Sequence, residues 1–181
     1  MIFEEKRIEV GGKELVLRSA TEEDTEMLMS YLKQVCGETR FLMFEEDEVD
    51  LTIDYEKEFI RKHMESDDST LIIGLYDGEY IGNCSFNREG ASRRNAHRAG
   101  IGIALFQKFT GLGLGRIMLT KLLEFIKSLG YEQVELIVIE GNDRARHLYE
   151  SVGFVEYGRR PNANKYDDGT YADDILMVLQ F

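Results

Sequence analysis

The sequence predicts an α/β fold formed by one domain of 181 residues. Segments with apolar residues at helical spacing alternate with shorter segments at strand spacing, as in a layered α/β protein. Hydrophobic residues make up 43% of the chain, which is enough for one substantial core at this length. The sequence has a single proline and no repeat or low-complexity linker. We therefore expect residues 1–181 to fold as a single domain.

Two hairpins and two helices are expected in the first half of the chain. Gly11-Gly12 and Asp77-Gly78 are typical of tight hairpin turns, and Thr21 followed by acidic residues is typical of a helix start. The expected strands are residues 7–10, 14–18, 71–76 and 80–87. The expected helices are residues 21–35 and 55–64, with an acidic connection at residues 45–50.

The second half is expected to contain a central strand and the most amphipathic helix of the chain. The strand covers residues 99–107 and the helix residues 113–129, ending at Gly130. One face of this helix carries four apolar side chains: Met118, Leu122, Ile126 and Leu129. A shorter helix is expected at residues 144–151, and further strands at 134–139, 154–158 and 175–179.

The charge balance restricts the partners of this protein. Lys and Arg total 22 and Asp and Glu total 34, giving a net charge of −12 that disfavours nucleic acid and anionic lipid. No apolar run approaches the ~20 residues needed to span a bilayer, and no signal-peptide pattern opens the chain. Cys36 and Cys84 are read as free, buried thiols of a cytoplasmic protein. No metal site is expected, because neither these cysteines nor the three histidines have ligand spacing: His63, His97 and His147.

A glycine-rich loop lies between the expected central strand and the long helix, with the sequence Thr110-Gly111-Leu112-Gly113-Leu114-Gly115-Arg116. Backbone N–H groups and the dipole at a helix N-terminus favour an anion, and glycines allow a phosphate to approach the backbone. Arg116 adds the local positive charge that a bound phosphate needs in so acidic a chain. A P-loop would need Lys and then Ser or Thr after the last glycine, and a dinucleotide fingerprint would need glycine in place of Arg116. A simple turn at the helix start is the remaining alternative.

A second motif follows the expected strand at residues 134–139. It reads Asn142-Asp143-Arg144-Ala145-Arg146-His147-Leu148-Tyr149-Glu150-Ser151-Val152-Gly153-Phe154. With this motif the chain resembles the GNAT superfamily of acyl-CoA-dependent N-acyltransferases, which carries Asn-x-x-Ala-x-x-Leu-Tyr-x-x-x-Gly-Phe. The superfamily also carries Gln/Arg-x-x-Gly-x-Gly/Ala at its pyrophosphate loop. Here both glycines are present, but Thr110 replaces Gln or Arg.

The resemblance implies a GNAT-like acyl-CoA N-acyltransferase fold, with a central mixed, mostly antiparallel sheet flanked by helices, and acetyl-CoA as cosubstrate. The pantetheine arm would pair with the backbone of the central strand at Ile103, Ala104, Leu105 and Phe106. The pyrophosphate would bind the N–H groups of Gly111, Leu112, Gly113, Leu114, Gly115 and Arg116. Asn142 would hydrogen-bond the pantetheine or its acetyl end.

The resemblance assigns the chemistry to Tyr149. Its hydroxyl, with an ordinary pKa of about 10, would donate a proton to the departing thiolate; packing on a helix face is the alternative. Relatives often use a glutamate as general base, and the matching positions here are Gly100 and Ile137. The amine proton could instead leave through water to a backbone carbonyl, to a carboxylate of residues 45–48 or to His97, or be lost before binding.

The acceptor site is expected near the first two helices and the segment that joins them. Its candidate residues are Phe44, Glu45, Glu46 and Glu48, with a solvated loop as the alternative. An aromatic and acidic lining suits a cationic amine. The expected reaction is direct transfer of an acetyl group from acetyl-CoA to a primary amine of a small molecule. The alternatives are a peptide amine acceptor, either a protein N-terminus or a lysine, and a non-catalytic CoA-binding sensor. A homodimer is left open.

Overall fold

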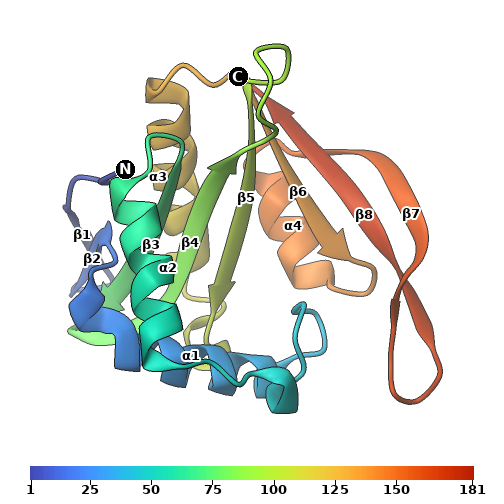
Figure 1. The fold of residues 1–181 in the computed structure, drawn as a ribbon, viewed down its shortest axis with the longest axis horizontal. Helices are drawn as coiled ribbons and strands as arrows, with labels where there is room; N and C mark the ends of the chain where they lie inside the picture. The colour runs from blue at the N-terminus through green and yellow to red at the C-terminus, as the bar shows by residue number, and fades with distance from the viewer. The chain divides into compact units, whose positions relative to one another are not determined.

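The computed structural model describes all 181 residues and divides the chain into two compact units (Figure 1). The first unit comprises Met1–Asn87 and Gly102–Phe125, and the second comprises Arg88–Ile101 and Ile126–Phe181. The strands are β1 (Lys6–Val10), β2 (Lys13–Ser19), β3 (Ser69–Tyr76), β4 (Glu79–Arg88), β5 (Arg98–Leu105), β6 (Gln133–Ile139), β7 (Val155–Lys165) and β8 (Tyr171–Gln180). The helices are α1 (Thr25–Glu38), α2 (Ile53–Glu65), α3 (Leu114–Ser128) and α4 (Asp143–Ser151).

The strands have the hydrogen-bonded order β1-β2-β3-β4-β5-β6-β8-β7. Strand β5 pairs with β6 in parallel. The pairs β1-β2, β2-β3, β3-β4, β6-β8 and β8-β7 are antiparallel. The expected α/β fold with a mixed, mostly antiparallel sheet is confirmed.

The two expected hairpins of the first unit are confirmed, and both have two-residue turns with left-handed backbone. Gly11 and Gly12 have φ of 59° and 77° between β1 and β2, and Asp77 and Gly78 have φ of 55° and 79° between β3 and β4. Two successive positive φ values are typical of the type I′ turn, whose twist matches that of paired strands.

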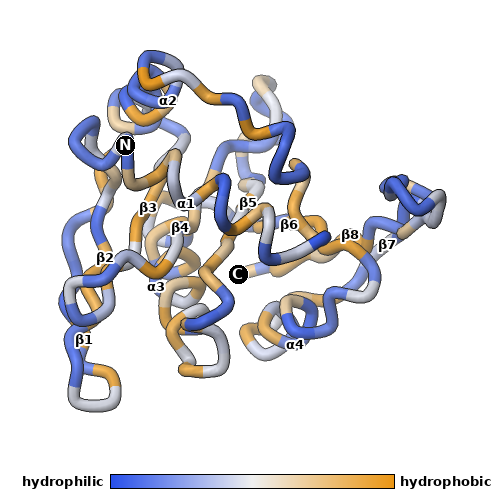
Figure 2. The backbone as a smooth tube through the Cα atoms, turned by 90° about the horizontal axis from the view of Figure 1, so that it is seen from below, coloured by the Kyte–Doolittle hydropathy of each residue, from blue (hydrophilic) through white to orange (hydrophobic).

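Helices cover both faces of the sheet in the first unit. Tyr80 of β4 packs edge-on against Tyr31 of α1, with ring centroids 5.0 Å apart. Its neighbour Ile81 points to the opposite face, where a Cβ built on Gly74 would stand 3.0 Å from Ile81 and 3.1 Å from Met118 of α3. Figure 2 shows hydrophobic residues along β3, β4 and α3. The core of this unit therefore lies between α3 and the sheet, with a second apolar layer under α1.

Several element boundaries differ from the expectations. A short 3₁₀ turn, Glu22–Asp24, precedes α1, because the Asp24 carboxylate turns back to accept the Thr21 N–H at 2.8 Å. Strand β5 ends at Leu105, so Phe106 lies outside it. Met118, Leu122 and Ile126 are fully buried as expected, but Leu129 lies beyond the end of α3 and is 39% exposed. Its predicted place on the buried face is therefore wrong.

The second unit is built on β6, β8 and β7, with α4 beside them (Figure 1). The expected strands at 154–158 and 175–179 are too short, because β7 continues to Lys165 and β8 begins at Tyr171. The pairing register shifts between Arg160 and Asn164, where Pro161 stands on an edge strand. A proline is tolerated at such a place because no ladder hydrogen bond is lost there.

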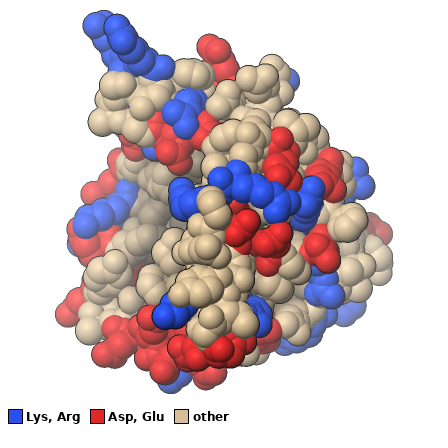
Figure 3. Space-filling view, turned by 90° about the vertical axis from the view of Figure 1, so that its right-hand side faces the viewer, with Lys and Arg blue, Asp and Glu red and all other residues tan.

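Charged side chains on this unit form ion pairs rather than a single-sign surface. Arg159 contacts Glu140 and Glu156, each at 2.8 Å, and Arg146 contacts Glu150 at 2.9 Å. Figure 3 likewise shows basic side chains interspersed with acidic ones. No helix of the chain is long and apolar enough to cross a membrane.

Candidate functional site

The glycine-rich loop of the first unit has open space in front of its backbone. Gly111 and Gly113 have φ of 80° and 78°, and a Cβ built at either would meet no atom within 4 Å. Glycine is therefore favoured here by the left-handed backbone conformation and not by crowding from neighbouring atoms. The carbonyl of Gly113 accepts the Ile117 N–H at 3.1 Å, and the fully buried Leu114 anchors the first turn of α3.

Polar contacts hold the loop at the end that precedes the glycines. The Glu38 carboxylate accepts the Gln107 N–H at 2.7 Å, and the Gln107 side chain donates to the Glu38 carbonyl. The Thr110 hydroxyl donates to the Gln107 carbonyl at 2.7 Å. Thr110, which replaces Gln or Arg of the motif, therefore closes the turn. Arg116 lies exposed in the first turn of α3, with Gly115 between it and Leu114.

The end of β5 offers only some of its backbone groups for pairing on its free side. The Phe106 N–H donates to the Ile81 carbonyl of β4 at 3.0 Å, and the Phe106 ring packs against Tyr31 with centroids 4.8 Å apart. Because peptide groups alternate in direction along a strand, the backbone N–H and C=O groups of Ala104 point towards β4, as the N–H group of Phe106 does. Ile103 and Leu105 direct their N–H and C=O groups to the other edge of β5.

The acidic segment gathers at the C-terminal end of α1. The Glu48 carboxylate accepts the Glu45 N–H at 2.9 Å, and a Cβ built on Gly37 would stand 2.6 Å from the Glu46 carboxylate. Burial raises the pKa of the Cys36 thiol, and the negative charges of Glu45, Glu46 and Glu48 raise it further. The last turn of α1 holds no basic residue, and a helix C-terminus is itself negative. This segment, next to the half-exposed Phe44, therefore has a negative potential that would attract a cation.

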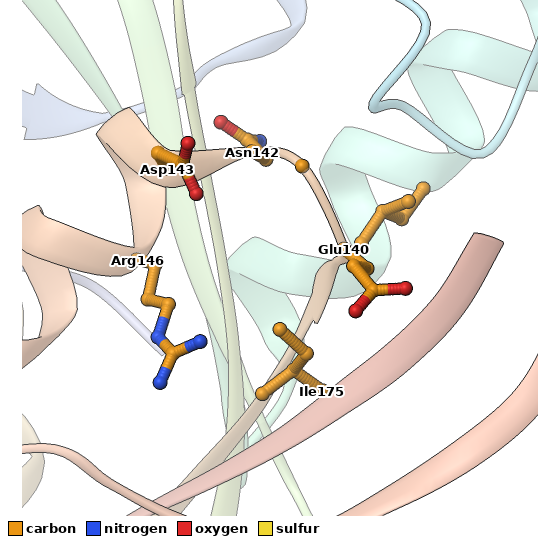
Figure 4. Close-up of a pocket in the computed structure, with 7 residues that line it drawn as sticks. Glu140, Asn142, Asp143, Arg146 and Ile175 are labelled. Atoms are coloured by element: carbon orange, nitrogen blue, oxygen red, sulfur yellow. The ribbon is translucent and has the colours of Figure 1, made fainter.

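Asn142 lies at the start of α4 in the second unit (Figure 4). Its Oδ1 accepts the Ala145 N–H at 3.3 Å, so the side chain caps the helix, while its NH₂ group makes no hydrogen bond within the chain. A pocket surrounds this cap, lined by Ile139, Glu140, Gly141, Asn142, Asp143, Arg146 and Ile175. Sequence reasoning missed Glu140, Arg146 and Ile175. Glu140 precedes the motif and Arg146 lies within it, but only the β6–β8 pairing brings Ile175 beside them.

Tyr149 lies on α4 with its ring buried at 7% exposure, edge-on to Phe154 with centroids 6.0 Å apart. Its hydroxyl makes no hydrogen bond within the chain. Burial raises the pKa of Tyr149 to about 12. The group is therefore protonated throughout the physiological pH range and has its proton available for donation.

The positions that match the glutamates of relatives carry no carboxylate of their own. Gly100 lies on β5, and Ile137 on β6 is 53% exposed. His97 stands in the turn before β5, and its carbonyl accepts the N–H groups of Glu132 and Gln133. Cys36 and Cys84 are both free and buried.

Comparison with known proteins agrees with this arrangement. Residues 29–154 match the acetyltransferase (GNAT) family. The chain is 26% identical to the acetyltransferase of GNAT family from Streptococcus pneumoniae, with a TM-score of 0.86 over 92% of this chain and 99% of that one. It shares its fold with yncA of Salmonella typhimurium, whose structure holds the cofactor acetyl-CoA, at 17% identity and a TM-score of 0.80 over 92% and 93% of the two chains.

A curated relative shares part of the sequence. The [ribosomal protein bS18]-alanine N-acetyltransferase of Haemophilus influenzae is 35% identical over 76 residues, which are 42% of this chain and 51% of that protein. The similarity thus spans about half the length of that relative. The family match covers well over half of the present chain and includes both motifs. The chain therefore belongs to the acetyltransferase (GNAT) family and is an N-acetyltransferase.

Proposed function

We propose that this protein transfers an acetyl group from acetyl-CoA directly to the primary amine of a small molecule, and that residues 1–181 act as one catalytic domain. The observation that carries this proposal is the open glycine loop at the start of α3. Gly111 and Gly113 keep left-handed backbone with free space in front of it, and α3 contributes its positive N-terminal end.

The loop would bind the CoA pyrophosphate through backbone N–H groups between Gly111 and Arg116. The exposed Arg116 adds the positive charge that a polyanion requires on a chain of net charge −12. The edge groups of Ile103 and Leu105 are oriented to pair with the pantetheine amides, as an added strand would. The NH₂ group of Asn142 would donate to a pantetheine or acetyl oxygen.

Tyr149 would act as the general acid. When the amine attacks the acetyl carbonyl, the C–S bond breaks and its electron pair remains on sulfur. A tyrosine whose pKa is raised to about 12 by burial is protonated at neutral pH, which is the form that can donate to the sulfur. The hydroxyl makes no hydrogen bond that it would have to give up.

The acidic segment supports a cationic acceptor. Glu45, Glu46 and Glu48 lie together at the negative end of α1, beside the half-exposed Phe44 ring. This arrangement would attract an ammonium group and pack against an apolar part of the same molecule.

A protein N-terminal amine is the second candidate acceptor. It is favoured by the similarity to the bS18-alanine N-acetyltransferase, whose name specifies an alanine of a ribosomal protein. A peptide N-terminus carries the same ammonium group as a small amine, so the acidic segment does not separate the two candidates.

A screen for free-thiol release with acetyl-CoA tests both candidates. The acceptors are small primary amines, amino acids, and peptides that begin with alanine or contain lysine, with mass spectrometry to locate the acetyl group. We expect release to depend on an amine and the product to gain one acetyl group on nitrogen. The same peptide with a blocked N-terminus is the matched control. Acetyl-CoA turnover that no amine increases would overturn the proposed function.

A further inference from the structure

One half-buried carboxylate of the second unit has no hydrogen-bond or ion-pair partner. Among its Asp and Glu residues that are not exposed, Glu135 pairs with Arg98, Asp173 accepts the Asn162 N–H, and Asp174 binds Arg160 and Asn164. The side chain of the fourth, Glu89, is half-buried and makes neither a hydrogen bond nor an ion pair. A partly desolvated carboxylate without a partner retains both oxygens as proton acceptors.

Glu89 lies directly over the central strand at Gly100. Its backbone N–H donates to the Arg98 carbonyl at 2.9 Å, which fixes it opposite the start of β5. A Cβ built on Gly100 would stand 2.2 Å from Glu89 Oε1 and 3.3 Å from its carboxyl carbon. No real Cβ tolerates such a contact, so the carboxylate occupies the space that a side chain at residue 100 would fill.

The loop that follows Glu89 is ordered by its own hydrogen bonds. Gly90 turns the chain with φ of 73°, and the Ser92 hydroxyl donates to Asn95 at 2.7 Å. The Arg98 N–H in turn donates to the Asn95 carbonyl at 3.2 Å. These contacts hold both ends of the loop, and they fix the Glu89 backbone relative to β5.

The Glu89 carboxylate lies near an ion pair of the same unit. Arg98 is engaged with Glu135 through two hydrogen bonds of 2.5 Å and 2.6 Å, and its charge also acts on Glu89. Tyr157 also shares this field, and burial raises its pKa. Glu89 is therefore the carboxylate of this group that is engaged in neither a hydrogen bond nor an ion pair.

We propose that Glu89 is the general base of the acetyl transfer, a carboxylate supplied from the β4–β5 loop to the surface of β5 at Gly100. This inference rests on the proposed function. The Glu89 carboxylate takes one proton from the acceptor ammonium and passes it to solvent. The freed nitrogen lone pair forms the N–C bond, and the C–S bond breaks with its electron pair on sulfur. The thiolate takes a second proton, and the amide nitrogen retains the third.

Steady-state kinetics of Glu89→Gln against wild type test the assignment, with an acceptor whose α-amino pKa is about 8. Glutamine keeps the shape but accepts no proton, so kcat/KM for the amine should fall by about 10²- to 10⁴-fold at pH 7, with KM for acetyl-CoA unchanged. The deficit should narrow from pH 7 to 9, because the amine then arrives unprotonated. Glu9→Gln, which removes an exposed carboxylate on β1, is the matched charge control and should behave as wild type.

A rescue pair separates a base from a structural residue. Glu89→Ala should lose activity. The double variant Glu89→Ala with Gly100→Glu should be at least tenfold more active than Glu89→Ala, because the alanine vacates the space that the new glutamate side chain enters. Glu89→Asp should retain partial activity. Near-wild-type activity in Glu89→Gln, or a loss that stays constant from pH 7 to 9, would overturn the assignment while leaving the proposed function intact. A wild-type chain that acetylates no amine would overturn both.

Discussion

Gly12 and Gly113 form a natural matched pair for testing the glycine loop. Their φ values are 77° and 78°, and a Cβ at either would meet no atom within 4 Å. Gly12 lies in the β1–β2 turn, whereas Gly113 directly precedes α3. Substitution by alanine should therefore cost the same at both positions, about 1–2 kcal/mol for a left-handed L-residue. In a chain of this length that corresponds to a fall in Tm of about 2–8 °C.

Acetyl-CoA affinity should separate the two variants. At Gly113 the new methyl group would enter the space proposed for the pyrophosphate, so the Kd should rise at least about tenfold, or about 1.4 kcal/mol. Gly12→Ala should bind as wild type. Isothermal titration calorimetry at one temperature, well below the Tm of both variants, measures the difference in Kd. Equal Kd values for the two variants, with equal losses of Tm, would refute the assignment of the loop.

Three further perturbations follow from the geometry. Tyr149→Phe keeps the buried ring but removes its proton, so kcat should fall about 10²- to 10⁴-fold with acetyl-CoA affinity unchanged; an unaltered single-turnover rate would return Tyr149 to a packing role. Neutralising Glu45, Glu46 and Glu48 together should raise KM for a cationic acceptor more than KM for acetyl-CoA, and equal changes would leave the segment a solvated loop. Burial alone would raise the pKa of Asp24, but its ion pair with Arg18 and hydrogen bonds from Thr21 outweigh burial and lower that pKa. The free energy of unfolding that this lowered pKa adds is present above the unfolded-state pKa of about 3.9 and is lost as pH falls through the folded-state pKa. Below about pH 4, the Tm should therefore fall more steeply in wild type than in Asp24→Asn. Parallel Tm curves would contradict this coupling.

Local features of the fold could be predicted from the sequence. Gly11-Gly12 and Asp77-Gly78 gave the hairpin turns because few other residues adopt successive positive φ values. The spacing of Met118, Leu122 and Ile126 identified the buried face of α3. Both motifs lie where a strand passes into a helix, and such junctions have strong local signals.

Features set by long-range pairing could not be predicted. Strand β7 runs past Pro161 because Asp174 binds Arg160 and Asn164 on either side of the bulge, and this contact depends on the β7–β8 register. The sequence showed that residue 100 is a glycine at a position where relatives often carry a glutamate. The sequence offered no sign that Glu89, eleven residues earlier, would cover it, because that contact depends on how the intervening loop folds.

Backbone amide shifts during a titration with acetyl-CoA test the central claim most directly. We propose that the glycine loop and the residues around Asn142 and Tyr149 take part in binding one cosubstrate. The N–H signals of Gly111, Gly113 and Gly115 and those at the start of α4 should then shift together and saturate with one Kd, while those of the β1–β2 turn stay unchanged. Shifts confined to one of the two groups, or two groups that saturate with different Kd values, would contradict the claim.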